Sequence, residues 1–283
     1  MPEELQQVEK ALRDLGRSLR RLPANPPPEK VHKLRTSARR VEAIAAALPQ
    51  IKEKKSHRLV KSIEPLRKAA GGVRDMDVLV ANLRKLAKDS EGDSLPRLMD
   101  HLEFVRAGSA NQLRQAMDRR RKTARTNLKR YAHEVRTGLP EAAPAAHANG
   151  RVNRANIGHH RNGVNPTAKH LAREIAEWPQ LGEQNIHDFR LKIKALRYIL
   201  QLDANADSAL VSDLGSVQRR IGDWHDWEQL AEIAHEFLEP ERDRALLARI
   251  DEFMQKKLTR ALAAATALRR QHLRATVVHI HGC

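Results

Sequence analysis

The stretch VHKLRTSARR, residues 31–40, places four cationic side chains and a histidine within ten positions, with no acid among them. His32, Arg35 and Arg39 follow the pattern H-x-x-R-x-x-x-R. This row is one residue out of register with the apolar positions of the same helix, and therefore lies about 100° from them around the helix axis. A basic row at the edge of an apolar face predicts a cationic groove, whereas an ordinary solvated face would lie opposite the core.

A second stretch, IHDFRLKIKALRY at residues 186–198, repeats the pattern with His187, Arg190 and Lys194, and Arg197 extends the row. Each row is followed by a glycine motif at a similar distance. GGVRDMD begins at residue 71, 39 residues after His32, and GDWHDWE begins at residue 222, 35 residues after His187. The shared order and spacing predict an internal repeat of two related halves. The apolar positions beside the second row are Ile186, Phe189, Ile193, Leu196 and Leu200.

The composition of the 283-residue chain favours helices, since aromatic residues make up only 3% and the remaining apolar content is mainly Ala and Leu. No segment alternates with period two over a useful length. We expect an all-α fold of two related helical bundles with pseudo-twofold symmetry around a basic central cavity. The halves are expected at 1–137 and 168–283, joined by a flexible linker at 138–167 that is rich in Pro, Gly, Asn and His.

Apolar spacing predicts ten helices, with the turn SEGDSLP and a short helix after the fourth. Pro65 is expected to kink or split the third helix, and Gly71-Gly72 to end it. Asp75 and Asp226 would then cap the helices that follow, with Asp77 in a first turn. A second role for these acids is to hold arginines toward a ligand. The expected ranges are 3–22, 29–48, 51–70, 75–89, 109–136, 168–177, 183–203, 207–221, 226–238 and 241–274.

The net charge of +17 predicts a polyanionic partner, which could be nucleic acid, an acidic membrane surface or a phosphate polymer. The single cysteine, Cys283, excludes an internal disulfide framework and fits a reducing cytosol. The N-terminus has no secretory h-region, and no apolar run approaches the roughly 20 residues of a membrane span. We therefore expect a cytoplasmic protein. No Walker-type loop, nucleophile elbow or metal-spaced cysteine set is present, so no catalytic residue, metal or cofactor is expected.

Two other function classes stay open on the residues alone. One is a nucleic-acid-binding helical protein, although aromatic side chains for base stacking are scarce and no helix-turn-helix or basic zipper is evident. The other is a metal-dependent phosphohydrolase, because His187-Asp188 and His225-Asp226 are compatible with an H…HD…D metal pattern. Cationic surroundings oppose metal binding there. Each histidine taken alone is more often a packed structural residue than a ligand.

Taken together, the four motifs resemble the CHAD family, the conserved histidine α-helical domain. The resemblance covers residues 5–275 approximately, apart from the linker, and rests on VHKLRTSARR, GGVRDMDVL, IHDFRLKIKALRY and LGSVQRRIGDWHD. It implies two helical bundles around a basic cavity, binding of inorganic polyphosphate and association with polyphosphate granules. Some members are fused to a triphosphate-hydrolysing barrel rich in E-x-E-x-K patterns. Nothing in this sequence resembles that barrel, so no hydrolase activity is implied.

The resemblance and the basic rows together assign the candidate polyphosphate ligands. The second half departs from the pattern, because Lys194 replaces an arginine, Ala195 stands where Arg40 stands, and His225 stands where Arg74 stands. Histidine is mostly uncharged at neutral pH, so the first half is expected to contribute more strongly. The candidates are His32, Arg35, Arg39, Arg40, Arg74, His187, Arg190, Lys194 and Arg197. A second tier consists of Lys68 and Arg219, which stand three residues before Gly71 and Gly222, and of Lys61, Arg114 and Arg121.

Overall fold

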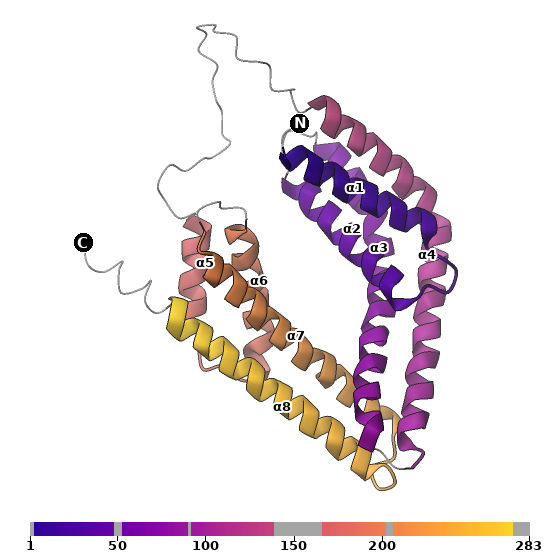
Figure 1. Ribbon diagram of the computed structural model, residues 1–283, viewed down its shortest axis with the longest axis vertical. Coiled ribbons are helices and arrows are strands. Elements are labelled where there is room, and N and C mark those ends of the chain that lie inside the picture. The colour runs from indigo at the N-terminus through magenta and orange to yellow at the C-terminus, as the bar shows by residue number, and fades with distance from the viewer. Residues whose placement is uncertain (1–2, 48–52, 90–91, 139–165, 202–205, 274–283) are drawn as a thin grey trace, which may run out of the picture. The chain divides into compact units, whose positions relative to one another are not determined.

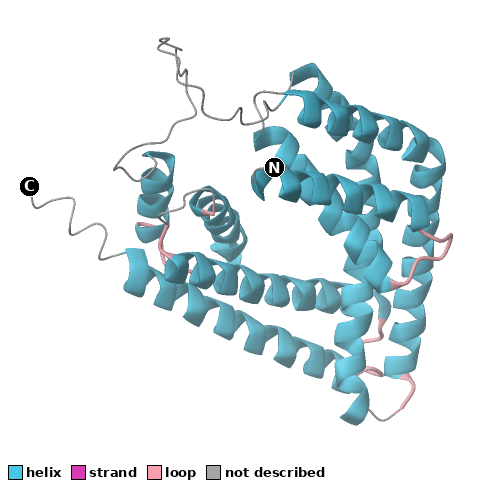
Figure 2. Cartoon of the chain, turned by 45° about the horizontal axis from the view of Figure 1, so that its top comes forward, coloured by secondary structure: helices cyan, strands magenta, loops and turns pink. Residues whose placement is uncertain are grey.

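The computed structural model describes residues 3–47, 53–89, 92–138, 166–201 and 206–273, and every element of secondary structure in these ranges is helical (Figures 1 and 2). This confirms the expected all-α class. The helices belong to two compact units, residues 1–150 and 151–283. The predicted flexible linker at 138–167 lies almost entirely outside the described residues.

The first unit is a four-helix bundle made of α1 (Glu3–Arg21), α2 (Pro28–Ala47), α3 (Glu53–Leu83) and α4 (Ser94–Gly138), with the short 3-10 helix η1 (Arg84–Asp89) between the last two (Figure 1). Each helix packs on the next, and α4 packs back on α1, so the four helices close a ring around one core. In such a ring the seam between α2 and α3 lies opposite the seam between α1 and α4.

The second unit has the same order of packing. It consists of α5 (Pro166–Ala176), α6 (Glu183–Leu200), α7 (Ser208–Phe237) and α8 (Arg244–Leu268), followed by the short π-helix η2 (Arg269–Leu273). Contacts run from α5 to α6, α7 and α8 in turn, and η2 closes the ring on α5. All five apolar positions predicted for the α6 face are buried, which confirms the register of that helix.

Helix α3 is longer than the sequence predicted. It runs without interruption through Pro65 and Gly71-Gly72, so the helix is not split at Pro65 and the expected end at the glycines is wrong. A kink at Pro65, the other expectation, stays a prediction. A glycine inside a helix costs about 1 kcal/mol relative to alanine, and a proline about 3 kcal/mol. Leu66 and Val73 are at most 1% exposed, and burial of each such side chain contributes about 1.5–3 kcal/mol. Tertiary burial on both sides of the breakers therefore outweighs their local cost.

Helix α7 corrects the prediction in the same way. The expected helices at 207–221 and 226–238 are one helix, which passes through Gly222. Trp224 and Trp227 are at most 2% exposed, and together they bury a large apolar area just after the glycine. Asp75 and Asp226 therefore lie inside helices, and their predicted capping role is wrong.

Helix α4 also replaces two predicted segments. It begins at Ser94, so the last three residues of the predicted turn SEGDSLP are already helical, and it includes both the short helix and the basic helix that was expected only from residue 109. Leu98 and Leu102, on its first turns, are fully buried. Gly108, in contrast, is exposed, and a Cβ added to it would have no other atom within 4 Å. The apolar contacts of the first turns hold the helix together across an exposed glycine.

Asp77 is a buried acid rather than the first-turn acid that the sequence predicted. Its side chain is 1% exposed, and Nε of Arg106 on α4 donates a hydrogen bond to its Oδ1 at 2.6 Å. Nη2 of the same arginine donates to the carbonyl oxygen of Pro26 at 3.0 Å. One guanidinium thus joins α3, α4 and the segment between α1 and α2.

We expect Asp77→Ala to lower the free energy of unfolding of the first unit by about 3–5 kcal/mol, because Arg106 would lose the acid that compensates its burial. Urea denaturation followed by circular dichroism measures this change. Glu103→Ala is the matched control, since it removes an exposed ion pair with Arg84 and should cost less than about 1 kcal/mol. Equal losses in the two variants would contradict the structural role given to Asp77.

Candidate functional site

Arg35 of α2 lies across the seam from α3. Its Nη2 is 3.7 Å from Oδ1 of Asp75, and its side chain is 27% exposed. Gly71 lies opposite the guanidinium, since a Cβ built there would be 3.8 Å from Nε of Arg35. The predicted position of this arginine at the edge of the core is confirmed, and it leaves one side of the guanidinium open to solvent.

Three further arginines surround Arg35 and with it form what we call the first basic cluster: Arg35, Arg39, Arg67 and Arg74. Partial burial lowers the pKa of Arg35, and the positive charge of Arg39 lowers it further, although Asp75 opposes the shift. Arg74 and Arg67 lower the same pKa. Arg35 therefore stands in a field of like charges that a bound anion would relieve.

Sequence reasoning missed Arg67. On a continuous helix, Arg67, Gly71 and Arg74 are spaced by four and three residues and share one face. The wrongly predicted helix end at Gly71 concealed this spacing. Arg67 is held in place by Glu42 of α2, whose Oε1 accepts a hydrogen bond from Nε of Arg67 at 2.8 Å.

In the second unit, two arginines of α6 lie against glycines of α7. A Cβ built on Gly222 would be only 3.1 Å from Nη2 of Arg190, and one built on Gly215 would be 3.2 Å from Cζ of Arg197. Nη1 of Arg197 also donates a hydrogen bond to Oε1 of Gln218 at 3.2 Å. The two glycines are seven residues apart and share one face of α7, which lets both guanidinium groups approach its backbone.

These side chains line an open groove with a volume of about 570 Å³ between α6 and α7. Its four arginines form what we call the second basic cluster: Arg190, Arg197, Arg219 and Arg220. Two acids, Asp223 and Asp226, are also in the lining, with Ser216 and Gln218 as neutral hydrogen-bonding groups. Arg220 was not predicted. A forked guanidinium suits a phosphate group, so the groove has the chemistry of an anion site.

The two clusters use matching positions of the chain. In the first unit, Arg35 of α2 faces Gly71 of α3. In the second unit, Arg190 of α6 faces Gly222 of α7. In both units a second side-chain contact joins the same two helices one or two turns away. The donor and acceptor of that second contact are exchanged between the units, since Arg67 donates to Glu42 and Arg197 donates to Gln218. Matching residues of α2 and α6 are 155 positions apart in the sequence, both for Arg35 and Arg190 and for Glu42 and Arg197. Matching residues of α3 and α7 are 151 positions apart, both for Gly71 and Gly222 and for Arg67 and Gln218.

His187 of α6 lies beside His225 of α7, with ring centroids 5.3 Å apart. Nδ1 of His225 is 2.8 Å from Oε2 of Glu228, so an acid already accompanies this ring. His225 occupies the position in α7 that Arg74 occupies in α3. The second unit therefore presents imidazole groups where the first presents a permanent cation.

Several predicted ligands lie apart from the clusters. Lys68 is 69% exposed and pairs with Glu64 at 2.8 Å, an interaction that also lowers the pKa of Glu64. Nζ of Lys194 lies 5.8 Å from the ring centroid of Tyr198. Arg114 and Arg121 are on α4 beside residues 23–26, and not at the seam of α2 with α3. The remaining exposed candidates, with no role in either cluster, are His32, Arg40 and Lys61.

Within the described ranges, no group of three or more His, Cys, Asp or Glu side chains is placed to hold a metal ion. No helix in that part of the chain is long and apolar enough to cross a membrane. The expected single cavity between the halves stays a prediction, because the positions of the two units relative to one another are not determined.

Comparison with known proteins gives one result. A family model described as CHAD domain matches residues 6–235, which include the first unit from residue 6 onward and the second unit as far as His235 in α7. No curated protein and no solved structure matches the chain. The matched range contains all the side chains of both basic clusters.

Substitution by alanine is expected to change the free energy of unfolding differently at Gly71 and at Gly222. Gly71→Ala should raise the free energy of unfolding by about 0.5–1 kcal/mol, because its new Cβ makes only an ordinary contact with Arg35. Gly222→Ala should gain less, because Nη2 of Arg190 must move away from a Cβ at 3.1 Å. Urea denaturation of both variants tests this difference. Equal gains would mean that Arg190 is not held against the backbone of α7.

Proposed function

Because the chain belongs to the CHAD domain family, we propose that it binds inorganic polyphosphate through its two basic clusters, without catalysing a reaction. The family resemblance described above supplies the ligand class. The observation that carries the proposal is the placement of Arg35 and Arg190, each held at a helix seam against a glycine and accompanied by further arginines. We further propose that binding takes place in the cytoplasm and associates the protein with polyphosphate granules.

Charge and geometry together support a linear phosphate polymer as the ligand. Polyphosphate carries about one negative charge per phosphate, and four arginines in each cluster provide several forked donors for neighbouring phosphate oxygens. Partial burial and then the neighbouring positive charges lower the pKa of Arg35, and a bound anion would offset both effects. Binding should release counterions and weaken steeply as the salt concentration rises.

The matching contacts of the two units support an internal repeat in which each half contributes one cluster. In this proposal, the glycines of α7 keep the facing arginines in position to bind the anion. A side chain at residue 222 or 215 would push the facing guanidinium outward, whereas glycine lets it lie flat against the helix with its outer donors available. Asp75 lies within ion-pair distance of Arg35, and Glu42 accepts a hydrogen bond from Arg67. These contacts fit the second role predicted for Asp75, which is to hold an arginine toward the ligand.

The central test is a calorimetric titration of the full chain with long-chain polyphosphate at about 150 mM salt, with single-stranded DNA as the parallel ligand. We expect tighter binding of polyphosphate at equal phosphate concentration. The variant Arg35→Ala with Arg190→Ala should raise Kd about a hundredfold or more, because a hydrogen bond to a charged group contributes about 1.5–3 kcal/mol and 1.4 kcal/mol is tenfold.

The control variant, Arg119→Ala with Arg120→Ala, makes the same change in net charge at two exposed positions of α4. It should change Kd by less than about threefold, since exposed charges act weakly and at long range. Equal losses in both double variants would show that the +17 charge acts diffusely. Preference for DNA would favour the nucleic-acid alternative, and metal-dependent release of phosphate would favour the phosphohydrolase.

The unequal chemistry of the two clusters gives a separate prediction. Arg74→His should weaken polyphosphate binding at pH 8, because a permanent cation of the first cluster is replaced by a mostly neutral ring. His225→Arg should strengthen binding at the same pH, because it supplies that cation to the second unit. Titration of both variants at pH 8 and at equal salt measures the change. Stronger binding by Arg74→His together with weaker binding by His225→Arg, or no change in either variant, would remove these two positions from the site.

A further inference from the structure

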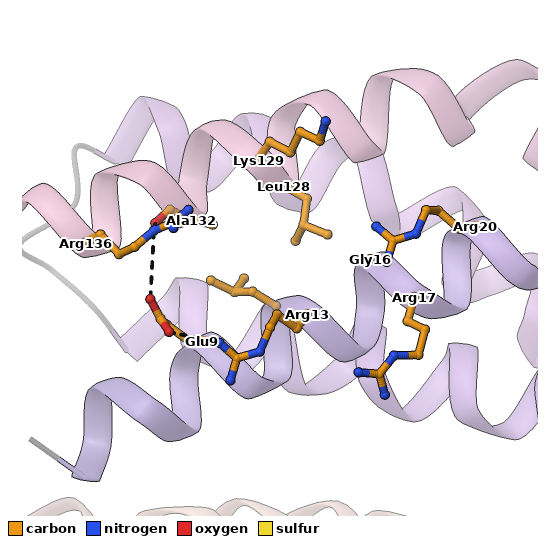
Figure 3. A pocket seen from close by; sticks show the side chains of 10 residues that line it. Glu9, Arg13, Gly16, Arg17, Arg20, Leu128, Lys129, Ala132 and Arg136 are labelled. Carbon is orange, nitrogen blue, oxygen red and sulfur yellow. Dashed lines mark hydrogen bonds and ion pairs between the residues drawn. The ribbon is translucent and has the colours of Figure 1, made fainter. Parts of the chain in front are cut away.

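A separate groove lies in the first unit between α1 and α4, on the opposite side of the four-helix ring from the first basic cluster. Its volume is about 280 Å³, and Figure 3 shows side chains of both helices around it. None of its lining residues belongs to either basic cluster, and none was a candidate ligand. It therefore needs an explanation of its own.

The deepest part of the groove is apolar. Leu12 and Leu128 are 3% and 5% exposed, and Figure 3 shows Leu128 pointing between the two helices. Gly16 and Ala132 complete this surface with the two smallest side chains. The groove thus offers an apolar bed about one helical turn long, with no hydrogen-bonding side chain at its base.

The sides of the groove are cationic. Five basic residues line it against a single acid, Glu9. Glu9 engages Arg13 at 2.9 Å and Arg136 at 3.8 Å. Arg20 and Lys129 have no ion pair or hydrogen bond with any described residue. The fifth base, Arg17, pairs with Asp14 at 3.4 Å, outside the groove lining.

The glycine in the apolar bed is not required by the packing of the chain itself. A Cβ on Gly16 would meet Cδ2 of Leu128 at 3.5 Å and Nη1 of Arg20 at 4.0 Å, both ordinary contact distances. Alanine would favour the helix by about 1 kcal/mol at this position. With glycine at position 16, helix α1 is less stable than it would be with alanine. The absent side chain leaves the groove deep at this point, beneath the guanidinium of Arg20, which has no partner among the described residues.

We propose that this groove binds a single-chain anionic amphiphile, with the alkyl chain on the apolar bed and a phosphate or carboxylate head between Arg20 and Lys129. The volume corresponds to about nine groups of the size of a water molecule, at about 30 Å³ each, which suits a medium-length chain. Polyphosphate has no apolar part and would leave the bed uncovered. The site is therefore distinct in chemistry, as well as in place, from the polyphosphate site.

The probe is octyl phosphate, titrated calorimetrically into the full chain below the concentration at which it forms micelles. Inorganic phosphate supplies the head alone, and octyl glucoside supplies the chain with a neutral head. We expect octyl phosphate to bind at least about tenfold more tightly than either, because charge and apolar contact contribute together. Equal affinity for octyl phosphate and one of the partial ligands would overturn the proposal.

Two sets of variants locate the binding. Gly16→Leu should weaken binding about tenfold by filling the groove, and Gly16→Ala should weaken it about threefold, because its single methyl group takes up part of the same depth while making only ordinary contacts within the chain. Arg20→Gln with Lys129→Gln should also weaken binding about tenfold, and its control is Arg119→Gln with Arg120→Gln on the exposed face of α4. Circular dichroism melts show that each variant is folded. An equal loss in the control pair would contradict the site.

A membrane surface is the other source of such a ligand, and flotation with vesicles containing about 30% anionic lipid distinguishes it. We expect monomeric octyl phosphate to bind and to compete with any vesicle association through this groove. Association with vesicles without binding of the monomer would overturn the proposal, because the groove would then act as a charged surface and not as a site for one chain.

Discussion

The continuity of α3 and α7 through their glycines is the constraint on which both basic clusters depend. Only an unbroken helix keeps Gly71 on the same face as Arg67 and Arg74, and Gly222 on the same face as Gly215. Those faces receive the arginines of α2 and α6. If the helices ended at the glycines, the facing guanidinium groups would have no flat backbone surface to lie on.

That continuity comes from burial and not from local preference. Glycine and proline weaken each helix by amounts that a short isolated segment would not survive. The large apolar side chains next to them are almost fully enclosed by the bundle, from Leu66 and Val73 in one unit to Trp224 and Trp227 in the other. The same packing that forms the core therefore positions the groups proposed to bind the anion at its edge.

Like charges at these edges are tolerated because each cluster includes partners that hold the side chains and offset only part of their charge. Asp75 and Glu42 each engage one arginine in the first unit, and in the second unit Arg197 is engaged by a neutral acceptor, Gln218. Partial burial lowers the pKa of Arg35, and its cationic neighbours lower it further despite Asp75, so the repulsion is reduced but persists. A protein with this arrangement has free energy to gain from a bound polyanion.

Periodicity and composition by themselves determined the all-α class, the buried face of α6 and the position of the basic rows at the edge of the core. These features follow from side-chain spacing along one helix, which a sequence displays directly. Only the tertiary structure decided that α3, α4 and α7 are continuous, that Arg67 and Arg220 join the clusters, and that Lys68 and Lys194 have other contacts. Whether a helix survives a glycine depends on contacts with distant residues, and the energy of those contacts cannot be read from local sequence.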